Sequence, residues 1–382
     1  MKNDLLVSIW IPTYNNGHLI WKSIESAINQ TYKNIEVVVF DDASSDGTEE
    51  VVKRYIEKDK RVRYFNTGKN IGTNKSFPKA IEMCRGELTI FLCSDDWLSK
   101  NYIEECVKLF IEHPDAGAVT GRVFSIFEKE GRWIFSREPE VKPGIYTRAW
   151  FAKNAYKTFI TSMIILGMVR KEDALKAARQ INEVVDNPPS EINEELRAMM
   201  QCDYGGEWIF CAEAMADHSE LCVSNKAVLL KSENDFEHYL ERKGSTKLRV
   251  EFGHGERTAK GILKFYYYSR ILYDVAYKND WSDYISTTRI FFGREAFATV
   301  IMEIIKNRFS RGFFKGFSFN EDVGIFFDGY SLFEKVVSVL LIIPRITTRL
   351  FASLGRRFFR VPQPDIYRPE YFLDEKGHFI MK

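Results

Sequence analysis

Residues 87–97 read Glu-Leu-Thr-Ile-Phe-Leu-Cys-Ser-Asp-Asp-Trp, a run of strand-favouring apolar side chains that ends at the adjacent carboxylates Asp95 and Asp96. The pattern predicts a buried strand. Two neighbouring carboxylates are costly to desolvate unless a cation offsets their charge, and the carboxyl edge of a parallel sheet has room for a cation and a phosphate ligand. We therefore interpret Asp95 and Asp96 as a candidate site for a hard divalent metal. The alternative is a pair of solvated carboxylates in a turn before a helix.

Three similar units precede this stretch. Residues 5–11, 35–40 and 62–65 are short apolar runs, and each is followed by a loop and then by apolar side chains at helical spacing. The second run also ends in a carboxylate pair, Asp41 and Asp42. Four such units predict an α/β fold with a mostly parallel, doubly wound sheet flanked by helices, whose ligands bind beyond the carboxyl ends of the strands.

Composition and motifs exclude several classes of protein. With 54 basic and 53 acidic side chains among 382 residues, a general nucleic-acid binder is not expected. No G-x-G-x-x-G follows a strand and no G-x-x-x-x-G-K-[ST] is present, which argues against a dinucleotide-binding dehydrogenase and a P-loop enzyme. The six cysteines are spread singly and resemble reduced core thiols of a cytoplasmic protein.

The chain shows no membrane-spanning or secretion pattern. Its first residues run directly into a strand pattern, without the apolar core and cleavage site of a secretion signal. It has no apolar stretch of about 18 residues, the length that a spanning helix needs. We therefore expect a cytoplasmic protein.

A linked set of motifs in the first third of the chain resembles a known family. In order and spacing they are similar to the nucleotide-diphospho-sugar glycosyltransferases of family 2, which have the Rossmann-like GT-A fold. The resemblance is strong from about residue 5 to 120, weaker to about 235, and not seen beyond. The motifs that carry it are Val7–Asn15, Ser26–Tyr32, Glu36–Thr48, Asn70–Gly72 and Ser94–Asp96.

The resemblance implies roles for the matching residues. Asp42 takes the position whose carboxylate accepts hydrogen bonds from the base of the nucleotide. Asp96, with Asp95 beside it, resembles the D-x-D element that holds Mg²⁺ or Mn²⁺ against the sugar diphosphate, so Asp95 is also a nucleotide-binding candidate. A divalent ion suits this chemistry, because it stabilises the charge that develops on the departing nucleoside diphosphate. The loop that lies against the nucleotide would comprise Pro12, Thr13 and Tyr14.

The chain departs from the family pattern at two places. Cys93 stands where the family often has a further Asp, so the metal site has one carboxylate fewer. The Arg-x-His of many members, whose His can join the metal, has no counterpart in residues 227–234. His238 follows this segment, but it is alone and more typical of a surface or helix residue.

Glu207 is the candidate general base. It follows Gly205 and Gly206 and opens a segment whose apolar residues Trp208, Cys211, Ala212 and Met215 recur at helical spacing. A carboxylate at a helix N-terminus behind two glycines can reach into a cleft and take a proton from an acceptor hydroxyl. The alternatives are an ordinary first-turn acid and the neighbouring Asp203, because the family usually shows Asp at the base position.

The last third of the chain changes character. Residues 236–330 are aromatic-rich and predict a helical extension, and residues 331–382 form an amphipathic tail. The apolar run 332–343 is too short to span a bilayer. The segment 331–360 contains one acid, Glu334, and six basic residues: Lys335, Arg345, Arg349, Arg356, Arg357 and Arg360.

The tail has the pattern of a helix that lies in a membrane interface. On a helical wheel, four of its arginines fall within about 60° of one another, so that a cationic side could face anionic headgroups. These are Arg345, Arg349, Arg356 and Arg360, and the opposite side carries Ile346, Leu350, Phe351, Leu354 and Phe358. A helix docked on its own domain is the alternative.

Together these features predict a GT-A transferase domain in residues 1–235, with a nucleotide-sugar half (1–120) and an acceptor half (121–235). We expect an inverting, metal-assisted glycosyltransferase that moves a sugar from a nucleotide-diphosphate donor to a lipid-linked or cell-surface glycan, in polysaccharide biosynthesis at the cytoplasmic face of the cell membrane. The alternative is a catalytically inactive nucleotide-sugar or glycan-binding protein.

Overall fold

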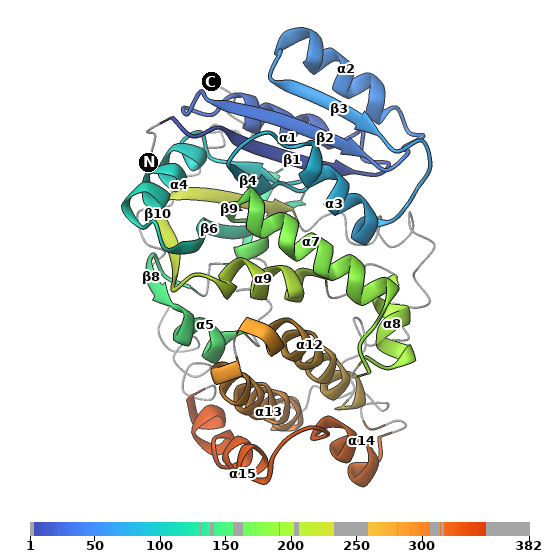
Figure 1. Cartoon of the computed structure of the whole chain (residues 1–382), viewed down its shortest axis with the longest axis vertical. Helices are drawn as coiled ribbons and strands as arrows, with labels where there is room; N and C mark the ends of the chain where they lie inside the picture. Colours follow the sequence, from blue (N-terminus) through green and yellow to red (C-terminus); the bar gives the residue numbers. More distant parts are fainter. Residues whose placement is uncertain are drawn as a thin grey trace.

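The computed structural model describes residues 4–129, 132–137, 141–155, 163–190, 192–201, 206–232, 259–280, 282–305, 314 and 317–348. A twisted sheet with its helices forms one end of the molecule, and the C-terminal helices form the other (Figure 1). The chain alternates strands and helices through its first third, as the apolar runs predict. These elements are β1 (Val7–Thr13), α1 (Ile20–Ile28), β2 (Ile35–Asp41), α2 (Thr48–Lys58), β3 (Val62–Asn66), α3 (Thr73–Met83) and β4 (Leu88–Phe91).

The second part of the sheet has a less regular order of elements. They are β5 (Trp97–Leu98), α4 (Tyr102–Glu112), β6 (Ala116–Lys129), β7 (Arg132–Arg137), β8 (Gly144–Thr147), α5 (Arg148–Asn154), β9 (Met168–Arg170), α7 (Lys171–Asp186), α8 (Glu194–Gln201), α9 (Gly206–Ala216) and β10 (Glu220–Ser232). The C-terminal helices are α12 (Ala259–Asp280), α13 (Ser282–Ile305), α14 (Phe319–Phe326) and α15 (Leu332–Leu340).

The sheet is mixed but mostly parallel. Its ten strands follow the order β3-β2-β1-β4-β9-β6-β10-β5, with β7 paired to β6 and β8 to β10. Strands β3, β2, β1, β4, β6 and β10 run in one direction, and the other four run against them. This confirms the predicted α/β class. The expected boundary between the two halves of the domain, at residues 120 and 121, falls inside β6, so both halves share that strand.

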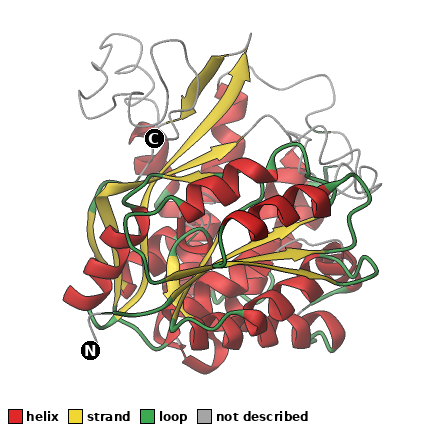
Figure 2. Cartoon of the chain, turned by 90° about the horizontal axis from the view of Figure 1, so that it is seen from above, coloured by secondary structure: helices red, strands yellow, loops and turns green. Residues whose placement is uncertain are grey.

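Helices cover both faces of the sheet (Figure 2). The chain moves from β1 through β2 to β3 and then returns to β4 on the other side of β1. Because such crossovers are right-handed, α1 and α2 lie on one face and α3 on the other, where α3 packs against α7. The carboxyl ends of β1, β2 and β4 therefore meet at one edge, next to the point where the strand order reverses.

Helix α9 joins the sheet to the C-terminal helices. The sequence predicted one packing face, but every residue from 208 to 216 is buried, so this prediction is wrong. The reason is that α9 contacts α7, β6 and α12 at once (Figure 1). Trp208 packs against Tyr273 of α12, with ring centroids 5.5 Å apart. One continuous cluster of buried apolar residues runs from β1 through α9 into α12 and α13.

Part of the tail prediction is wrong. Arg345 was expected on a cationic face that points toward headgroups, but its guanidinium binds both carboxylate oxygens of Glu295 in α13, at 2.9 and 3.0 Å. A buried carboxylate attracts the nearest cation inward. Residues 349–382, which include the other predicted arginines of this face, lie outside the described part of the chain.

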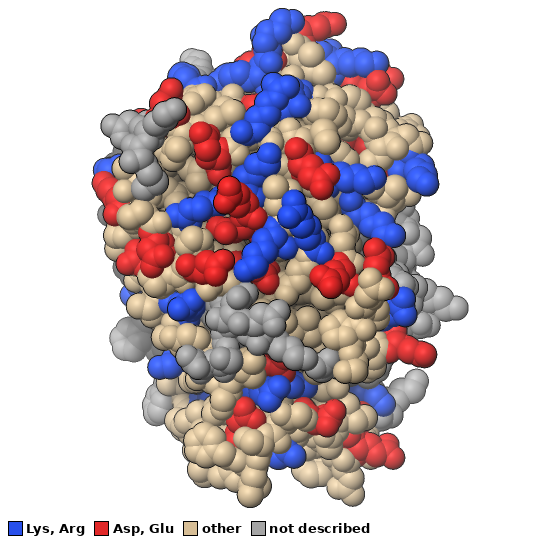
Figure 3. Space-filling model, viewed as in Figure 1, with Lys and Arg blue, Asp and Glu red and all other residues tan. Residues whose placement is uncertain are grey.

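Charges of both signs are intermixed over the sheet end of the molecule, as seen in Figure 3, whereas the opposite end, over α15, shows few charges. Among the described residues, no helix has the length and apolar character to cross a bilayer.

A buried carboxylate connects the first strands. Glu36 of β2 is 6% exposed and accepts hydrogen bonds from the Ser8 hydroxyl of β1 and the Arg63 guanidinium of β3, each at 2.7 Å, and from the Arg85 backbone N–H. Burial raises the pKa of Glu36, but the bonds from Ser8, Arg85 and Arg63 outweigh it and hold the pKa below its ordinary value of 4.5. Glu36 therefore stabilises the folded state in its ionised form.

We expect Glu36→Gln to lower the free energy of unfolding by about 1–3 kcal/mol at pH 7, because the amide cannot accept from both Ser8 and Arg63. The contribution of the carboxylate is present above its unfolded-state pKa of about 4.5 and is lost as the pH falls through the lower folded-state pKa. The difference in the free energy of unfolding between wild type and variant, measured by denaturant titration, should therefore become smaller below a pH of about 4.5.

Glu49→Gln is the matched control, because the Glu49 side chain is 45% exposed and its salt bridge in the described chain is to the exposed Lys53, at 2.7 Å. Its unfolding curve should stay close to that of the wild type. A Glu36→Gln protein as stable as the wild type at pH 7, or a gap that stays constant down to acid pH, would contradict the assignment.

Candidate active site

Three loops meet at the carboxyl edge of the sheet, one after each of β1, β2 and β4. Side chains tie the loops to one another: the Asn16 amide donates to the Ser94 hydroxyl at 2.7 Å, and the Gly17 N–H donates to the Asp46 carboxylate at 2.9 Å. Thr13 lies directly opposite Asp41 in the register of β1 and β2. The structure therefore brings together the residues that the sequence placed at one edge.

Two of these loops begin with an unusual backbone conformation. Asn15, after β1, has φ of 51°, and Ala43, after β2, has φ of 66°. Residues with a side chain rarely adopt the left-handed region, and they do so where the surroundings impose it, often at functional sites. Here the surroundings are mutual hydrogen bonds, because the Asn15 N–H donates to the Ser44 hydroxyl and the Asn15 side-chain oxygen accepts from the Ser45 N–H.

The two carboxylates after β2 have different surroundings. Asp41 accepts from the Tyr64 hydroxyl at 2.6 Å and from the Ser44 N–H at 2.8 Å, so it holds its own loop. Asp42 is buried and accepts from the N–H groups of Ile71 and Gly72, both at 2.9 Å. Asp42 thus fixes the Asn70–Gly72 turn before α3, a contact that sequence reasoning missed.

The residues predicted to lie against a nucleotide differ in exposure. Thr13 is 5% exposed, and its hydroxyl has no hydrogen-bond partner within the described chain. Pro12 and Tyr14 are half-buried at the same edge. A buried hydroxyl without a partner is costly, so the Thr13 hydroxyl is suited to bind a polar ligand group.

Asp95 and Asp96 follow β4, as predicted. Asp96 is 1% exposed, and one carboxylate oxygen accepts from the Ser232 N–H at the end of β10, at 2.8 Å. Its other oxygen is buried without a hydrogen-bond partner in the described residues. Asp95 is half-buried. Burial, and then the charge of Asp95, raise the pKa of Asp96 well above 3.8, while Lys231 and the Ser232 N–H oppose the rise.

These residues fit a divalent cation. Single ligand atoms of Cys93, Asp95 and Asp96 all lie within 4.8 Å of one another. The unpartnered Asp96 oxygen supplies a hard ligand, as Mg²⁺ and Mn²⁺ prefer. Helix α1 fixes the backbone of this cluster, because the Ser23 hydroxyl donates to the backbone carbonyls of Asp96 and Cys93 at 2.8 and 3.0 Å. These residues could therefore hold a cation, which would lower the repulsion between the two carboxylates.

Glu207 lies in the first turn of α9 and is half-buried. Its carboxylate is close enough to Cys211, one turn on, to raise the pKa of that thiol together with burial, which is the larger cause. Gly206 packs on the start of α3, where an added Cβ would lie 2.9 Å from the Asn74 side-chain oxygen. Gly206, the residue before Glu207, therefore lies against the helix that follows the turn held by Asp42. Asp203, the alternative base, lies outside the described residues, as does His238.

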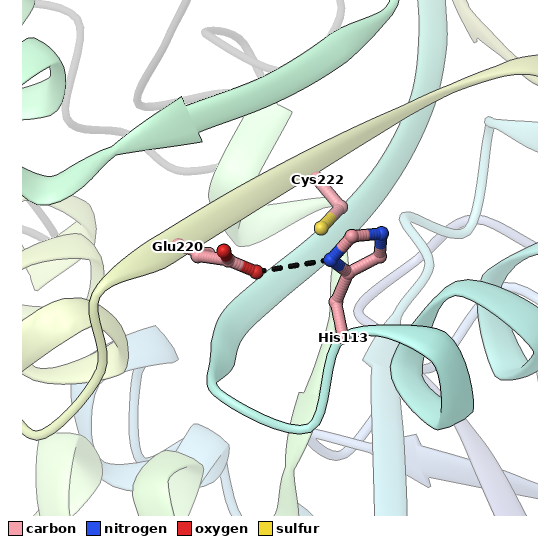
Figure 4. Close-up of side chains that lie close together, drawn as sticks. All are labelled: His113, Glu220 and Cys222. Carbon is pink, nitrogen blue, oxygen red and sulfur yellow. Dashed lines mark hydrogen bonds and ion pairs between the residues drawn. The ribbon is translucent and has the colours of Figure 1, made fainter.

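A second group of metal-ligating side chains lies elsewhere. His113 Nδ1 is 3.1 Å from the Glu220 carboxylate, and Cys222 completes the group (Figure 4). Burial, with the charge of Glu220, raises the pKa of the Cys222 thiol to about 12, so the thiol stays protonated. Glu220 opens β10 and Ser232 closes it, so this group is at the other end of the strand from Asp96. It is a hydrogen-bonded histidine and carboxylate beside a buried thiol, and it is separate from the candidate site.

Comparisons with known proteins agree with this geometry. Residues 8–172 match the profile of Glycosyl transferase family 2. The chain is 33% identical to glycosyltransferase GlyA of Streptococcus pneumoniae over 132 residues. This alignment covers 35% of this chain and 19% of that protein. The chain is also 30% identical over 202 residues to chondroitin synthase of Escherichia coli, covering 49% of this chain and 29% of that protein. The chain thus matches less than a third of the length of either relative.

The fold is similar to a solved structure over nearly the whole chain. Residues 1–349 of S. aureus TarS, in complex with UDP-GlcNAc, align with a TM-score of 0.56 and 18% identity, covering 93% of each chain. This similarity supports the GT-A fold. The profile match to Glycosyl transferase family 2 covers residues 8–172, the part of the chain that holds the family motifs and the shared sheet edge.

Proposed function

We propose that this protein transfers a sugar from a nucleoside-diphosphate donor to a hydroxyl of a glycan acceptor, with inversion and with the help of a divalent metal. The observation that carries the proposal is the Asp95 and Asp96 pair, in which a buried carboxylate oxygen of Asp96 has no partner among the described residues. It lies at the sheet edge where α/β enzymes bind nucleotides.

The donor would lie across the three loops. Thr13 offers a buried hydroxyl without a partner in the described chain, and Pro12 and Tyr14 offer half-buried surface for the nucleotide. Asp42 already accepts two backbone N–H groups, but each carboxylate oxygen has more than one lone pair, so it can still accept from a base. The structural neighbour supports a nucleotide sugar as donor, since TarS was solved in complex with UDP-GlcNAc.

Asp95 and Asp96 would hold Mg²⁺ or Mn²⁺, with Cys93 beside them. Such an ion, when bound, neutralises charge on a departing diphosphate. The protein fixes the position of Asp96, because the Ser232 N–H donates to its carboxylate and the Ser23 hydroxyl donates to its backbone carbonyl. Lys231, whose charge opposes the rise in the pKa of Asp96, adds positive charge on the same side.

Glu207 would act as general base. Its carboxylate takes the proton of the acceptor hydroxyl, whose oxygen attacks the anomeric carbon while the bond to the diphosphate breaks. Its position in the first turn of α9, beside the start of α3, supports this role. The acceptor class that fits best is a lipid-linked or cell-surface glycan, as names among the relatives such as chondroitin synthase suggest.

Calorimetric titration with UDP, GDP and dTDP, each with and without Mn²⁺, tests the metal site. We expect one nucleotide to bind in a metal-dependent manner and Asp96→Asn to lose the metal-dependent part, because the amide removes the charge and one hard ligand oxygen. Asp217→Asn, at an exposed position, is the control and should bind as the wild type does. Binding that Mn²⁺ does not affect would rule out the Asp95 and Asp96 site.

Glu207→Gln tests the base. We expect sugar transfer to fall by about 10²–10⁴-fold, the usual contribution of general base catalysis, while nucleotide binding stays nearly unchanged. Transfer should be followed with the donor that the titration selects, and Asp203→Asn should be measured beside it. Substantial turnover by Glu207→Gln together with a loss in Asp203→Asn would move the role to Asp203. Normal nucleotide binding without any transfer by the wild type would favour the nucleotide-sugar-binding alternative.

A further inference from the structure

Helix α15 has the reverse of the usual orientation of an amphipathic helix. Six large apolar residues of α15 and the turn after it are between 49% and 78% exposed: Leu332, Phe333, Val336, Val339, Leu340 and Ile343. At 100° per residue they fall within about 120° of one another. We call them the outer apolar face. On the opposite side, the polar residues Glu334, Ser338 and Arg345 point into the protein together with the buried Ile342.

Specific polar contacts fix this orientation. Glu334 is 4% exposed and closes a capping box with Ser331. The Ser338 hydroxyl donates to the Ile290 carbonyl of α13 at 3.2 Å, next to Gly293, where an added Cβ would lie 2.7 Å from that hydroxyl oxygen. Arg345, seven residues further along the chain, forms its two bonds to Glu295 of α13. The helix cannot turn its apolar side inward without breaking the bonds that Ser338 and Arg345 make to α13.

The exposed apolar residues are concentrated at this end of the molecule. Of the twelve large apolar residues exposed in the described chain, eight lie between residues 319 and 343, because Phe319 and Ile325 of α14 add to the six of the outer apolar face. The same end shows few charged side chains in Figure 3. Single exposed apolar residues are normal, but a contiguous patch marks a contact with another apolar phase or partner.

Charge identifies the partner. In residues 331–348 the only acid is Glu334, which is buried, so α15 presents no exposed acid. Lys335 lies beside the outer apolar face, and the sequence continues into Arg349, Arg356, Arg357 and Arg360. Exposed acids begin only at α14 and the turn after it. An apolar face flanked by basic residues is complementary to a bilayer with anionic headgroups.

We propose that the outer apolar face of α15 lies on an anionic lipid bilayer and holds the enzyme at the membrane surface. The apolar side chains would enter the boundary between headgroups and acyl chains, while the polar side of the helix remains bonded to α13. Because α15 is at the opposite end of the molecule from β1, β2 and β4 (Figure 1), the contact leaves the candidate site at their carboxyl ends free. The inference extends the proposed function toward lipid-linked acceptors but rests on different residues.

Cosedimentation of the full chain with vesicles of phosphatidylglycerol and phosphatidylethanolamine tests the proposal. We expect the wild type to bind, and a variant with Phe333→Ser, Val336→Ser, Leu340→Ser and Ile343→Ser to bind at least about tenfold less, because binding scales with the apolar area inserted. Ile145→Ser, which removes an exposed apolar side chain of β8, is the control and should bind as the wild type does.

Amide hydrogen exchange of the unmodified protein gives a second measurement that does not depend on the variant folding. Exchange over residues 332–343 should slow when vesicles are added. A wild type that fails to bind, a four-serine variant that binds equally, or unchanged exchange would overturn the proposal. So would light scattering that shows a dimer in the wild type, a monomer in the variant and no vesicle binding, because the face would then join two copies of the chain. Retained nucleotide binding and sugar transfer in the four-serine variant would separate this result from a failure of the proposed function.

Discussion

The close approach of two carboxylates at the end of β4 is the constraint on which the rest of the site depends. Asp96 is almost fully buried beside Asp95, and it stays in place because β10 brings the Ser232 N–H to it and α1 brings the Ser23 hydroxyl to its carbonyl. Strands far apart in the sequence must therefore pair correctly before the two charges can be held together. The sheet supplies this placement, and a bound cation would relieve the remaining repulsion.

Much of the first third could be predicted, because its signals are local. The apolar runs set β1, β2, β3 and β4, and the parallel order then places their carboxyl ends, with Asp42 and Asp96, at one edge. The contacts that complete the site are not local. Neither the bonds from Ile71 and Gly72 to Asp42 nor the bond from Ser232 to Asp96 follows from spacing, since each joins residues about 30 or more positions apart. The roles of Glu207 and of the loop residues remain predictions.

The C-terminal helices show a different limit of sequence reasoning. A helical wheel identifies which residues share a face, but not which face points inward. The wheel grouped Arg345 with solvent-facing arginines, whereas buried Glu295 draws it to α13. The predicted single packing face of α9 failed for a related reason, because neighbours on three sides cover that helix. In both cases, the direction in which a side chain points depends on a neighbour that is distant in the sequence.

The burial of α9 also determines how the protein can be divided. Its side chains are covered by the sheet on one side and by α12 on another, and Trp208 contacts both Phe265 and Tyr273. A transferase domain cut near residue 235 would leave this helix exposed to water on the α12 side. The family match therefore marks a region of sequence rather than an independent folding unit, because the sheet and the first C-terminal helices share one apolar core.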